Sequence, residues 1–300
     1  LLRRNSSTMY EAVYHIEKAY DGMAVKDFLK KIHGYSTRQI IRIKKDTDAI
    51  RLNGKHVFVV VPLHKNDELV IRLRDEEKDV PLLDTVVPIA FENEDVIVFD
   101  KPPFMPCHPS KLHPDDTLAN AFAALMKTRG ETLTFRCVNR LDRDTSGLVV
   151  VAKNQLTASL LGKTTQKEYC AIVCGKVDDS GCIDAPIGRD HEWEITRKVM
   201  ENGQRAVTHY ECLCKNNEYS YVRIHLETGR THQIRVHFAH IGHPLVGDEL
   251  YGGDHSILPR HALHCRQVRF ITPSDGQEHV VTSPLFDDMH KLLASEGLVL

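Results

Sequence analysis

The sequence lacks the features that mark membrane, fibrous and disordered proteins. Its apolar runs, such as Val57–Pro62 and Leu148–Ala152, are far shorter than the roughly 20 residues that cross a bilayer. No secretory signal pattern opens the chain. With 13 prolines, 17 glycines and 42% hydrophobic residues, the composition fits neither a collagen-like nor a disordered chain. We therefore expect a soluble globular protein, and a length of 300 residues predicts about two domains.

Cysteine is also scarce. The eight cysteines make up under 3% of the chain and form no CxxC pair, which predicts reduced, buried thiols in a cytoplasmic protein. Histidine, by contrast, occurs 18 times. His237 and His240, and likewise His261 and His264, have a spacing that fits one helix face, but neither pair has a third ligand at a recognisable spacing. We predict no metal site.

Charge is distributed unevenly along the chain. Residues 1–78 contain 16 Lys and Arg against 11 Asp and Glu, whereas the remainder contains 23 against 30. This asymmetry favours a basic accessory module beside a less basic main body. Solvated surface charge would explain the excess equally well.

The first 75 residues contain two short helical patterns. Apolar residues at helical spacing predict a first helix that ends near Gly34; they are Val25, Phe28, Leu29 and Ile32. Ser36 and Gln39 form a capping-box sequence that begins a second helix, which runs to about Lys45. On this second helix Arg38, Arg42 and Lys45 lie four and three residues apart and therefore share one face.

A β-hairpin follows the two helices. Asn53-Gly54 is a strong turn signal between alternating residues, and Val57–Val61 and Leu69–Leu73 are predicted to complete a small sheet. Residues 20–74 as a whole resemble an S4-type RNA-binding domain. The resemblance implies that the basic helix face neutralises RNA phosphates, which carries affinity but little sequence information. A solvated basic face in a small α/β module is the alternative.

The rest of the chain predicts a second, larger domain. Residues 76–88 indicate a linker, which separates a module at 10–75 from a domain at 89–293, with tails at 1–9 and 294–300. Many short apolar runs and few helices favour an α+β fold on a mixed, mostly antiparallel sheet. The predicted strands are 96–99, 148–152, 169–173, 219–226 and 268–271, and the predicted helices are 118–126 and 232–241.

Two polar clusters adjoin predicted strands, where rigid sheets commonly hold catalytic groups. Asn139–Leu148 precedes one strand, and a turn at residues 145–147 is expected to hold Asp142 at its mouth. Glu227–His237 leaves another strand and enters a helix. Arg235 adjoins the buried face of that helix and needs an anionic partner. Asp142 would meet that need, and an ionised, partly desolvated aspartate is a competent nucleophile. Taken alone, the first cluster could equally be a solvated turn.

Five separated blocks in family order resemble the RluA family of RNA pseudouridine synthases. They are Phe99–Pro102 with Cys107–Ser110, Arg140–Asp142 with Thr145–Leu148, Lys167–Tyr169, Gly229–His237, and His243–Asp248 with Tyr251-Gly252. The resemblance spans nearly the whole second domain and implies a pseudouridine synthase fold. An S4-like N-terminal domain is a common attachment in this family.

The resemblance also implies roles for individual residues. Asp142 matches the essential aspartate, which acts on a uridine flipped out of its RNA, and Arg235 matches the arginine that pairs with it. Tyr169 matches the tyrosine that packs on the flipped base and is a candidate to help remove the C5 proton. Arg140 matches a basic residue that fills the gap in the base stack. The other predicted RNA contacts are Arg143, Thr145, Lys167, Arg230, His232 and Gln233, together with Arg38, Arg42 and Lys45.

The implied reaction converts uridine to pseudouridine without a cofactor. The N1–C1′ bond breaks, the uracil rotates, and C5 bonds to C1′, so no redox change and no external group is involved. Asp142 could attack C1′, add to uracil C6, or remove the 2′ proton, and the sequence does not choose among these routes. Ribosomal RNA is the preferred substrate and transfer RNA the other candidate. We expect a monomer with no membrane partner.

One departure and two alternatives accompany this interpretation. Asn139 stands where many family members have histidine, and an asparagine can keep a hydrogen bond but carries no proton at neutral pH. We expect Asn139 to position its neighbours. The first alternative is an inactive RNA-binding protein on the same scaffold. The second is an aspartate-nucleophile phosphatase, although Asp142-Arg143-Asp144-Thr145 does not match the D-x-D-x-T spacing of that class.

Overall fold

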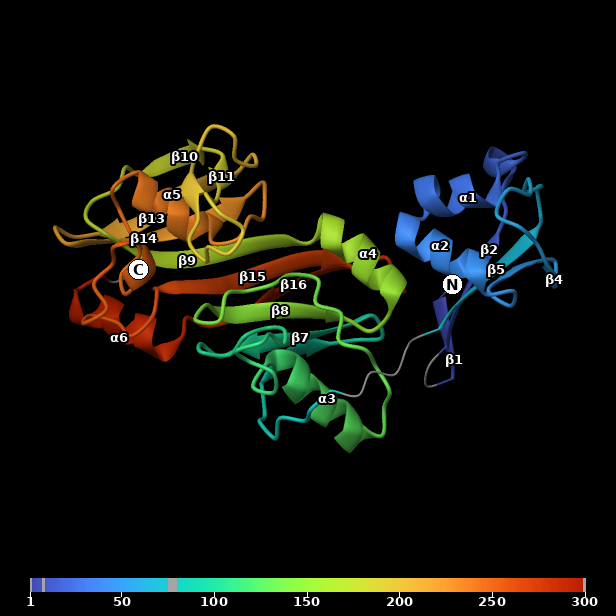
Figure 1. Cartoon of the computed structure of the whole chain (residues 1–300), viewed down its shortest axis with the longest axis horizontal. Helices are drawn as coiled ribbons and strands as arrows, with labels where there is room; N and C mark the ends of the chain where they lie inside the picture. The colour runs from blue at the N-terminus through green and yellow to red at the C-terminus, as the bar shows by residue number, and fades with distance from the viewer. Residues whose placement is uncertain (1, 7–8, 75–79, 299–300) are drawn as a thin grey trace.

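The computed structural model describes residues 2–6, 9–74 and 80–298, which form an N-terminal module and a larger domain (Figure 1). Within the described part of the module, the strands form a five-stranded sheet in the order β1-β2-β5-β3-β4. Its elements are β1 (Leu2–Ser6), β2 (Met9–His15), η1 (Lys18–Tyr20), α1 (Val25–Asp27), η2 (Phe28–Ile32), α2 (Thr37–Lys45), β3 (Ile50–Leu52), β4 (Lys55–His56) and β5 (Glu68–Arg74).

The local signals of the module are largely confirmed. The first predicted helix is α1 continued by the π turn η2, and Phe28 and Leu29 are buried, although Ile32 is exposed. Helix α2 begins with the predicted capping box, in which the Ser36 side chain accepts from the Gln39 backbone and the Gln39 side chain accepts from the Ser36 backbone. Asn53 and Gly54 both have positive φ, as a type I′ turn requires.

Two predictions for the module are wrong. Val57–Val61 is a loop, because the Val59 and Val61 carbonyls accept from the first backbone N–H groups of helix α1 instead of from a strand. Residues 1–9 were predicted to be a tail, but they contribute strand β1 and the first residue of strand β2. Strand β1 pairs with β2, and β2 pairs with β5.

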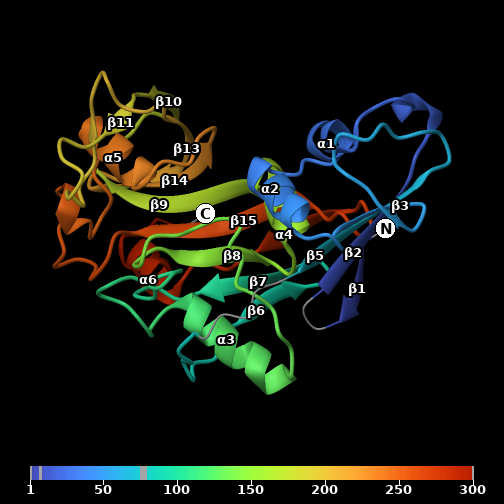
Figure 2. The same cartoon turned by 45° about the vertical axis from the view of Figure 1, so that its right-hand side comes forward.

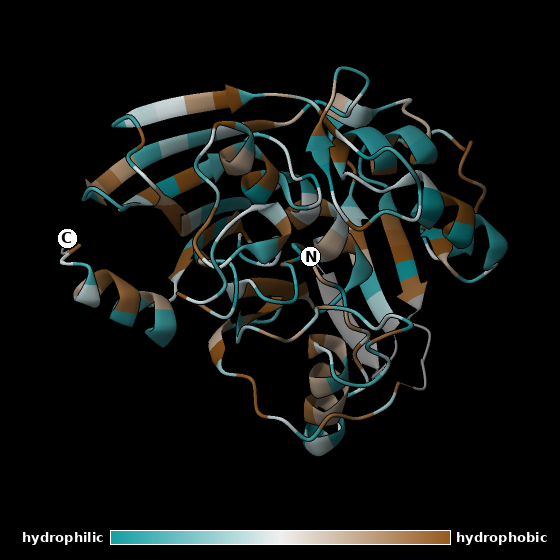
Figure 3. Ribbon diagram, turned by 60° about the vertical axis from the view of Figure 1, so that its left-hand side comes forward, coloured by the Kyte–Doolittle hydropathy of each residue, from teal (hydrophilic) through white to brown (hydrophobic). Residues whose placement is uncertain are grey.

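The larger domain is built on a mixed, mostly antiparallel sheet, as predicted. Among the described residues it is a nine-stranded sheet in the order β10-β13-β14-β9-β15-β8-β7-β6, with β16 beside β15. Its strands are β6 (Ile89–Glu92), β7 (Val96–Lys101), β8 (Ser146–Ala152), β9 (Gln166–Cys174), β10 (Ser180–Asp184), β13 (Val207–Lys215), β14 (Tyr219–Leu226), β15 (Leu263–Ile271) and β16 (Glu278–Thr282). Apolar residues gather along these strands (Figure 3).

Helices and a small hairpin complete this domain. They are α3 (Leu118–Arg129), α4 (Gln155–Thr164), β11 (Ile187–Gly188), β12 (Lys198–Val199), α5 (Gln233–His240), η3 (Glu249–Tyr251) and α6 (Asp287–Ser295). Helices α3 and α5 match the predictions, whereas α4 and α6 were not predicted. Helix α6 and the buried Leu298 show that the expected tail at 294–300 begins inside the fold. None of the helices in the described ranges is long and apolar enough to span a membrane.

The central strands β8 and β15 run parallel, and their backbones approach each other closely at Gly147. Gly147 of β8 has φ +106°, and a Cβ placed there would lie 2.3 Å from the Cys265 carbonyl oxygen. Only glycine allows this approach and this backbone conformation. The Ser146-Gly147 sequence therefore fixes where the polar loop before β8 sits.

Three of the four histidines considered as metal ligands are instead bonded within the protein. His237 contacts Thr208 Oγ1 and the Ala185 carbonyl, and the His261 ring contacts Thr145 Oγ1. His264 Nδ1 contacts Ser146 Oγ at 3.0 Å. In the part of the chain that the structure describes, no three His, Cys, Asp or Glu side chains gather as a metal site.

Burial of His264 predicts a loss of stability in mild acid. Burial lowers the pKa of His264 to about 4 from the ordinary 6.5, so the folded state holds this ring neutral. The unfolded chain binds the proton first as the pH falls from about 6.5 to about 4, and the free energy of unfolding should therefore fall by up to about 3 kcal/mol. Urea unfolding measured across this range checks the prediction. The His264→Asn variant should have a shallower pH dependence, and an unchanged slope would contradict it.

The module packs directly on helix α4, which lies between α2 and the central sheet (Figures 1 and 2). Tyr10 donates its hydroxyl to the Lys153 carbonyl at 2.6 Å, and Gln39 donates its amide to the Gln155 carbonyl at 3.1 Å. The hydroxyl of Ser159 donates to the Gly34 carbonyl at 3.1 Å. The predicted linker is likewise packed in part: residues 75–79 lie outside the described residues, but the Pro81 carbonyl accepts from Asn120 at 2.8 Å.

Candidate active site

The loop before β8 carries Asp142 at the centre of the domain. The Thr145 backbone N–H donates to the Asp142 carbonyl at 3.1 Å, so the tight turn spans residues 142–145 and Ser146 already belongs to the strand. This corrects the turn predicted at 145–147. The Asp142 side chain is 29% exposed, so its carboxylate is partly desolvated yet reachable from outside.

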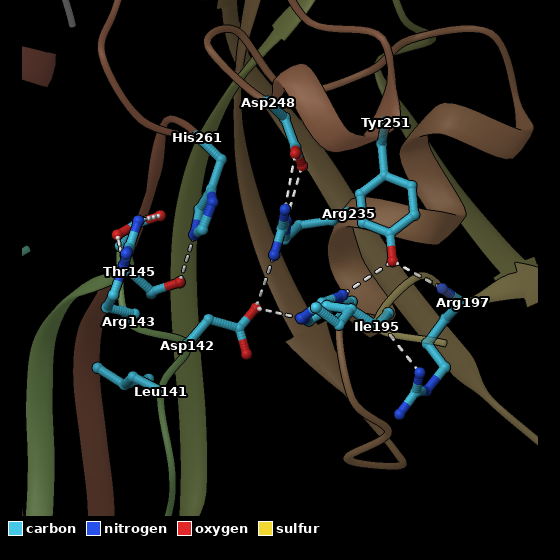
Figure 4. Close-up of polar contacts among 12 residues, drawn as sticks. Leu141, Asp142, Arg143, Thr145, Ile195, Arg197, Arg235, Asp248, Tyr251 and His261 are labelled. Carbon is cyan, nitrogen blue, oxygen red and sulfur yellow. Dashed lines mark hydrogen bonds and ion pairs between the residues drawn. The ribbon is translucent and has the colours of Figure 1, made fainter. Parts of the chain in front are cut away.

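Arg235 of helix α5 links two aspartates (Figure 4). Its Nη1 donates to Asp142 Oδ2 at 3.2 Å, which confirms the predicted contact. Its stronger partner is Asp248, which accepts from Nε and Nη2 at 2.7 Å each. Arg235 and Asp248 are 8% and 1% exposed, so the buried guanidinium is fixed by Asp248 and presents its remaining edge to Asp142.

A second chain of contacts reaches Asp142 from the hairpin β11–β12. His232 Nε2 lies 3.8 Å from Asp142 Oδ2, and His232 Nδ1 contacts the Tyr251 hydroxyl at 2.8 Å. That hydroxyl accepts from the Arg197 backbone N–H at 2.9 Å. Burial lowers the pKa of His232, an effect that Asp142 opposes, so the ring is neutral at pH 7. His232 has φ +58°, a strained conformation that begins α5 and aims the ring at Asp142.

Tyr169 lies on β9, across β15 from the Asp142 loop, and both residues line the same pocket. Burial raises the pKa of Tyr169 well above its ordinary value of 10. The side chain is therefore a neutral phenol, which can stack on a base and donate a hydrogen bond but is not a phenolate base.

Most predicted site residues of the larger domain meet at this pocket. It has a volume of about 70 Å³ and opens to solvent. Its predicted members are Arg140, Asp142, Thr145, Tyr169, Arg230, His232, Gln233 and Arg235. A larger cleft continues from it and includes Arg143 and Lys167. Arg140 is exposed and has no protein hydrogen bond or ion pair among the described residues, so it is available to a ligand.

Two of the predicted RNA contacts, Gln233 and Thr145, make hydrogen bonds within the protein. The Gln233 amide donates to the Val207 carbonyl and to Thr208, and its oxygen accepts from Thr228 and from the Arg230 backbone. Thr145 is buried and bonded to His261 at 2.7 Å. Both side chains therefore help to hold the walls of the pocket together.

The remaining predicted residues lie outside the pocket wall. Arg143 is paired with the adjacent Asp144 at 2.7 Å and is half exposed. Arg38, Arg42 and Lys45 lie on the face of α2 opposite its buried residues, and they line neither the pocket nor the cleft.

The side chains of Asn139 and Lys101 hold the Asp142 loop in place through hydrogen bonds. Asn139 donates to the Leu148 carbonyl at 3.0 Å and accepts from the Val150 backbone at 2.9 Å, as expected of a positioning residue. Lys101 was not predicted. Its buried ammonium donates to the Pro102, Met105 and Arg143 carbonyls at 2.8 to 3.1 Å, and burial lowers its pKa to about 8. Lys101 thus ties the loop after β7 to the residue that follows Asp142.

The chain is similar to known proteins over most of its length. Residues 95–240 match the family model described as RNA pseudouridylate synthase. The protein named "Uncharacterized RNA pseudouridine synthase YjbO" of Bacillus subtilis is 39% identical over 92% of this chain and all of its own length. The ribosomal large subunit pseudouridine synthase D of Pseudomonas aeruginosa is 38% identical over 77% of this chain and 79% of its own length. The structure of human RNA pseudouridylate synthase domain containing 4 has the same fold, with a TM-score of 0.56 at 22% identity, over 69% of this chain and 91% of its own.

Proposed function

The chain belongs to the RluA family of RNA pseudouridine synthases, and we propose that Asp142, Tyr169 and Arg235 carry out its reaction on ribosomal RNA. It is an enzyme that isomerises uridine in RNA to pseudouridine. The observation that carries the assignment of residues is the Asp142–Arg235 contact of 3.2 Å in a pocket that Tyr169 also lines.

The proposed division of labour follows from these contacts. Asp142 is the catalytic residue, because its carboxylate is reachable and faces the space that a flipped uridine would fill. Arg235 is a positioning residue: held by Asp248, it orients the Asp142 carboxylate and stabilises its negative charge. Tyr169 provides a neutral ring for the base. Stacking of this kind contributes about 1–3 kcal/mol, which offsets the few kcal/mol that base flipping costs.

The chemistry requires these residues to act at the sugar and at the base in turn. The N1–C1′ bond breaks, the uracil rotates within the pocket, C5 bonds to C1′, and the proton on C5 leaves. Attack of Asp142 on C1′, its addition to C6, and removal of the 2′ proton all begin from the same carboxylate. The proposal is common to the three routes.

We propose that the N-terminal module is an S4-like RNA-binding domain and that RNA extends from the pocket toward it. The cleft beside the pocket includes Lys163 and Lys167, at the end of α4 and the start of β9. Helix α4 also packs against the module that carries the basic face of α2. Ribosomal RNA is favoured because relatives such as the Pseudomonas aeruginosa protein are named for the large ribosomal subunit.

Neutralising the basic face of α2 is expected to weaken RNA binding and reduce its salt dependence. In the variant with Arg38→Gln, Arg42→Gln and Lys45→Gln, up to three phosphate contacts are lost. The slope of log K against log[salt], which is negative, should become less steep by about 2 to 3. Filter binding over a range of salt concentrations measures this slope, while tritium release at saturating RNA should persist.

A matched control changes the net charge equally without touching the proposed path. The exposed Lys127, Lys176 and Lys291 line neither the pocket nor the cleft. Their triple replacement by glutamine should leave the slope nearly unchanged. Equal slopes in the two triple variants would show that the basic face of α2 is ordinary surface charge and does not contact RNA.

The substrate assignment is tested by release of tritium from C5-tritiated uridine. Purified protein should release tritium from unmodified ribosomal RNA and much less from transfer RNA. Mapping pseudouridines in ribosomal RNA from cells with and without the protein should then reveal the modified position. Preferential release from transfer RNA would overturn the ribosomal assignment and leave the enzymatic one intact.

A further inference from the structure

The hairpin β11–β12 carries the only tryptophan of the chain on its tip. Trp193 is 79% exposed, and its ring stacks on that of His191 with centroids 4.5 Å apart and planes 8° from parallel. Ile195, also at the tip, is 71% exposed. The tip thus presents one flat aromatic face and an adjacent apolar side chain to solvent.

The tip is ordered by its own arginines, not by burial. The Arg197 guanidinium donates to the carbonyls of Glu194, Ile195 and Thr196 at 2.8 to 3.0 Å. The Arg189 guanidinium donates to the Glu192 carbonyl. A fixed loop conformation lowers the entropic cost of stacking a ligand on Trp193.

The tip is also tied to the active site. Ile195 lines a hollow that it shares with Asp142, His232 and Arg235. The Arg197 backbone is bonded to Tyr251 (Figure 4). The Tyr251 hydroxyl in turn contacts His232. The exposed ring is therefore two residues from the wall of the hollow beside the catalytic carboxylate.

Accepting the proposed function, we infer that Trp193, backed by His191, stacks on an unpaired nucleobase of the RNA near the flipped uridine. The expected ligand is a base, because Trp193 presents an exposed flat aromatic face that can stack on one. Every nucleobase has a flat face that can stack on an aromatic ring, so the interaction tolerates any sequence. Trp193 and His191 thus form an aromatic platform, which would hold the RNA strand beside the flipped uridine in line with the pocket.

The single tryptophan makes the inference directly measurable. Emission from Trp193 in the wild-type protein should be quenched as a short single-stranded oligouridylate binds, whereas a blunt RNA duplex, whose base faces are covered, should not quench it. Filter retention of the same radiolabelled RNA measures occupancy independently. Unchanged emission at saturating oligouridylate would overturn the inference, and so would failure of the wild-type protein to bind it.

Substitutions separate stacking from structure. Trp193→Ala should weaken binding of the oligouridylate about 5- to 150-fold, the range that corresponds to about 1–3 kcal/mol per stacked base. Trp193→Phe should recover most of that loss. In tritium release from ribosomal RNA, KM should rise by a similar factor while kcat stays within about twofold. Val280→Ala, an exposed apolar change on β16 away from the pocket, should alter neither constant.

The outcomes distinguish this inference from the proposed function. Equal affinities and equal KM values for wild type and Trp193→Ala would overturn the platform even if tritium release is normal. A change in Trp193 emission with protein concentration but not with RNA would also overturn it, because the tip would then contact another protein copy. Quenching by RNA without any tritium release would instead overturn the assigned reaction and leave the platform standing.

Discussion

An Asp248→Ala variant is expected to lose about 3–5 kcal/mol of unfolding free energy together with most of its activity. Asp248 is 1% exposed and accepts two hydrogen bonds from Arg235, which is itself 8% exposed. Removing the aspartate leaves a buried guanidinium with only the longer contact to Asp142. The guanidinium must then shift or draw in water, so Asp142 loses its fixed partner. Urea unfolding and tritium release measure the two losses.

Two further variants separate charge from packing in this prediction. Replacing both partners, as Arg235→Met with Asp248→Leu, removes the unpaired charge and should restore most of the stability but none of the activity. Asp179→Ala removes an aspartate from an ion pair with Lys215 that lies in solvent, and should leave the stability nearly unchanged. A stable and fully active Asp248→Ala variant would show that Arg235 is positioned by other groups.

The sequence predicted the elements whose apolar residues have a clear period. Strand β8 and helix α3 were found because their buried residues are continuous or follow helical spacing. Helix α4 was missed because small and polar residues dominate it, and its signal is the Asn154 side chain that caps the Thr157 backbone. Helix α6 has Met289 and Leu292 at helical spacing, so its signal was present and was not used.

The sequence predicted most residues of the candidate site but not the hydrogen bonds and ion pairs that connect them. The need of Arg235 for an anion was recognised, yet its main partner is Asp248, which the turn after α5 brings back over 13 residues. No local pattern encodes that return. Gln233 and Thr145 were assigned to RNA because polar residues in a cluster look alike in sequence, whereas their hydrogen bonds show that they serve the fold. The role of Lys101 depends likewise on three carbonyls that only the fold assembles.

We propose that the Asp142 carboxylate performs the reaction. Asp142→Asn keeps the size and shape of the side chain but removes its negative charge, so it cannot act as nucleophile or base on any of the three routes. We expect tritium release to fall by roughly four orders of magnitude or more, the scale on which loss of an essential catalytic group acts in other enzymes. Binding of RNA should persist, because Tyr169 and Arg140 remain.

The decisive measurement is tritium release from C5-tritiated ribosomal RNA with the Asp142→Asn variant in excess over its substrate. Asp275→Asn, which alters an exposed turn between β15 and β16, provides a matched control and should release tritium at the wild-type rate. We expect no release above background from Asp142→Asn, while filter binding shows the RNA retained. Release at a rate near that of the wild type would contradict it.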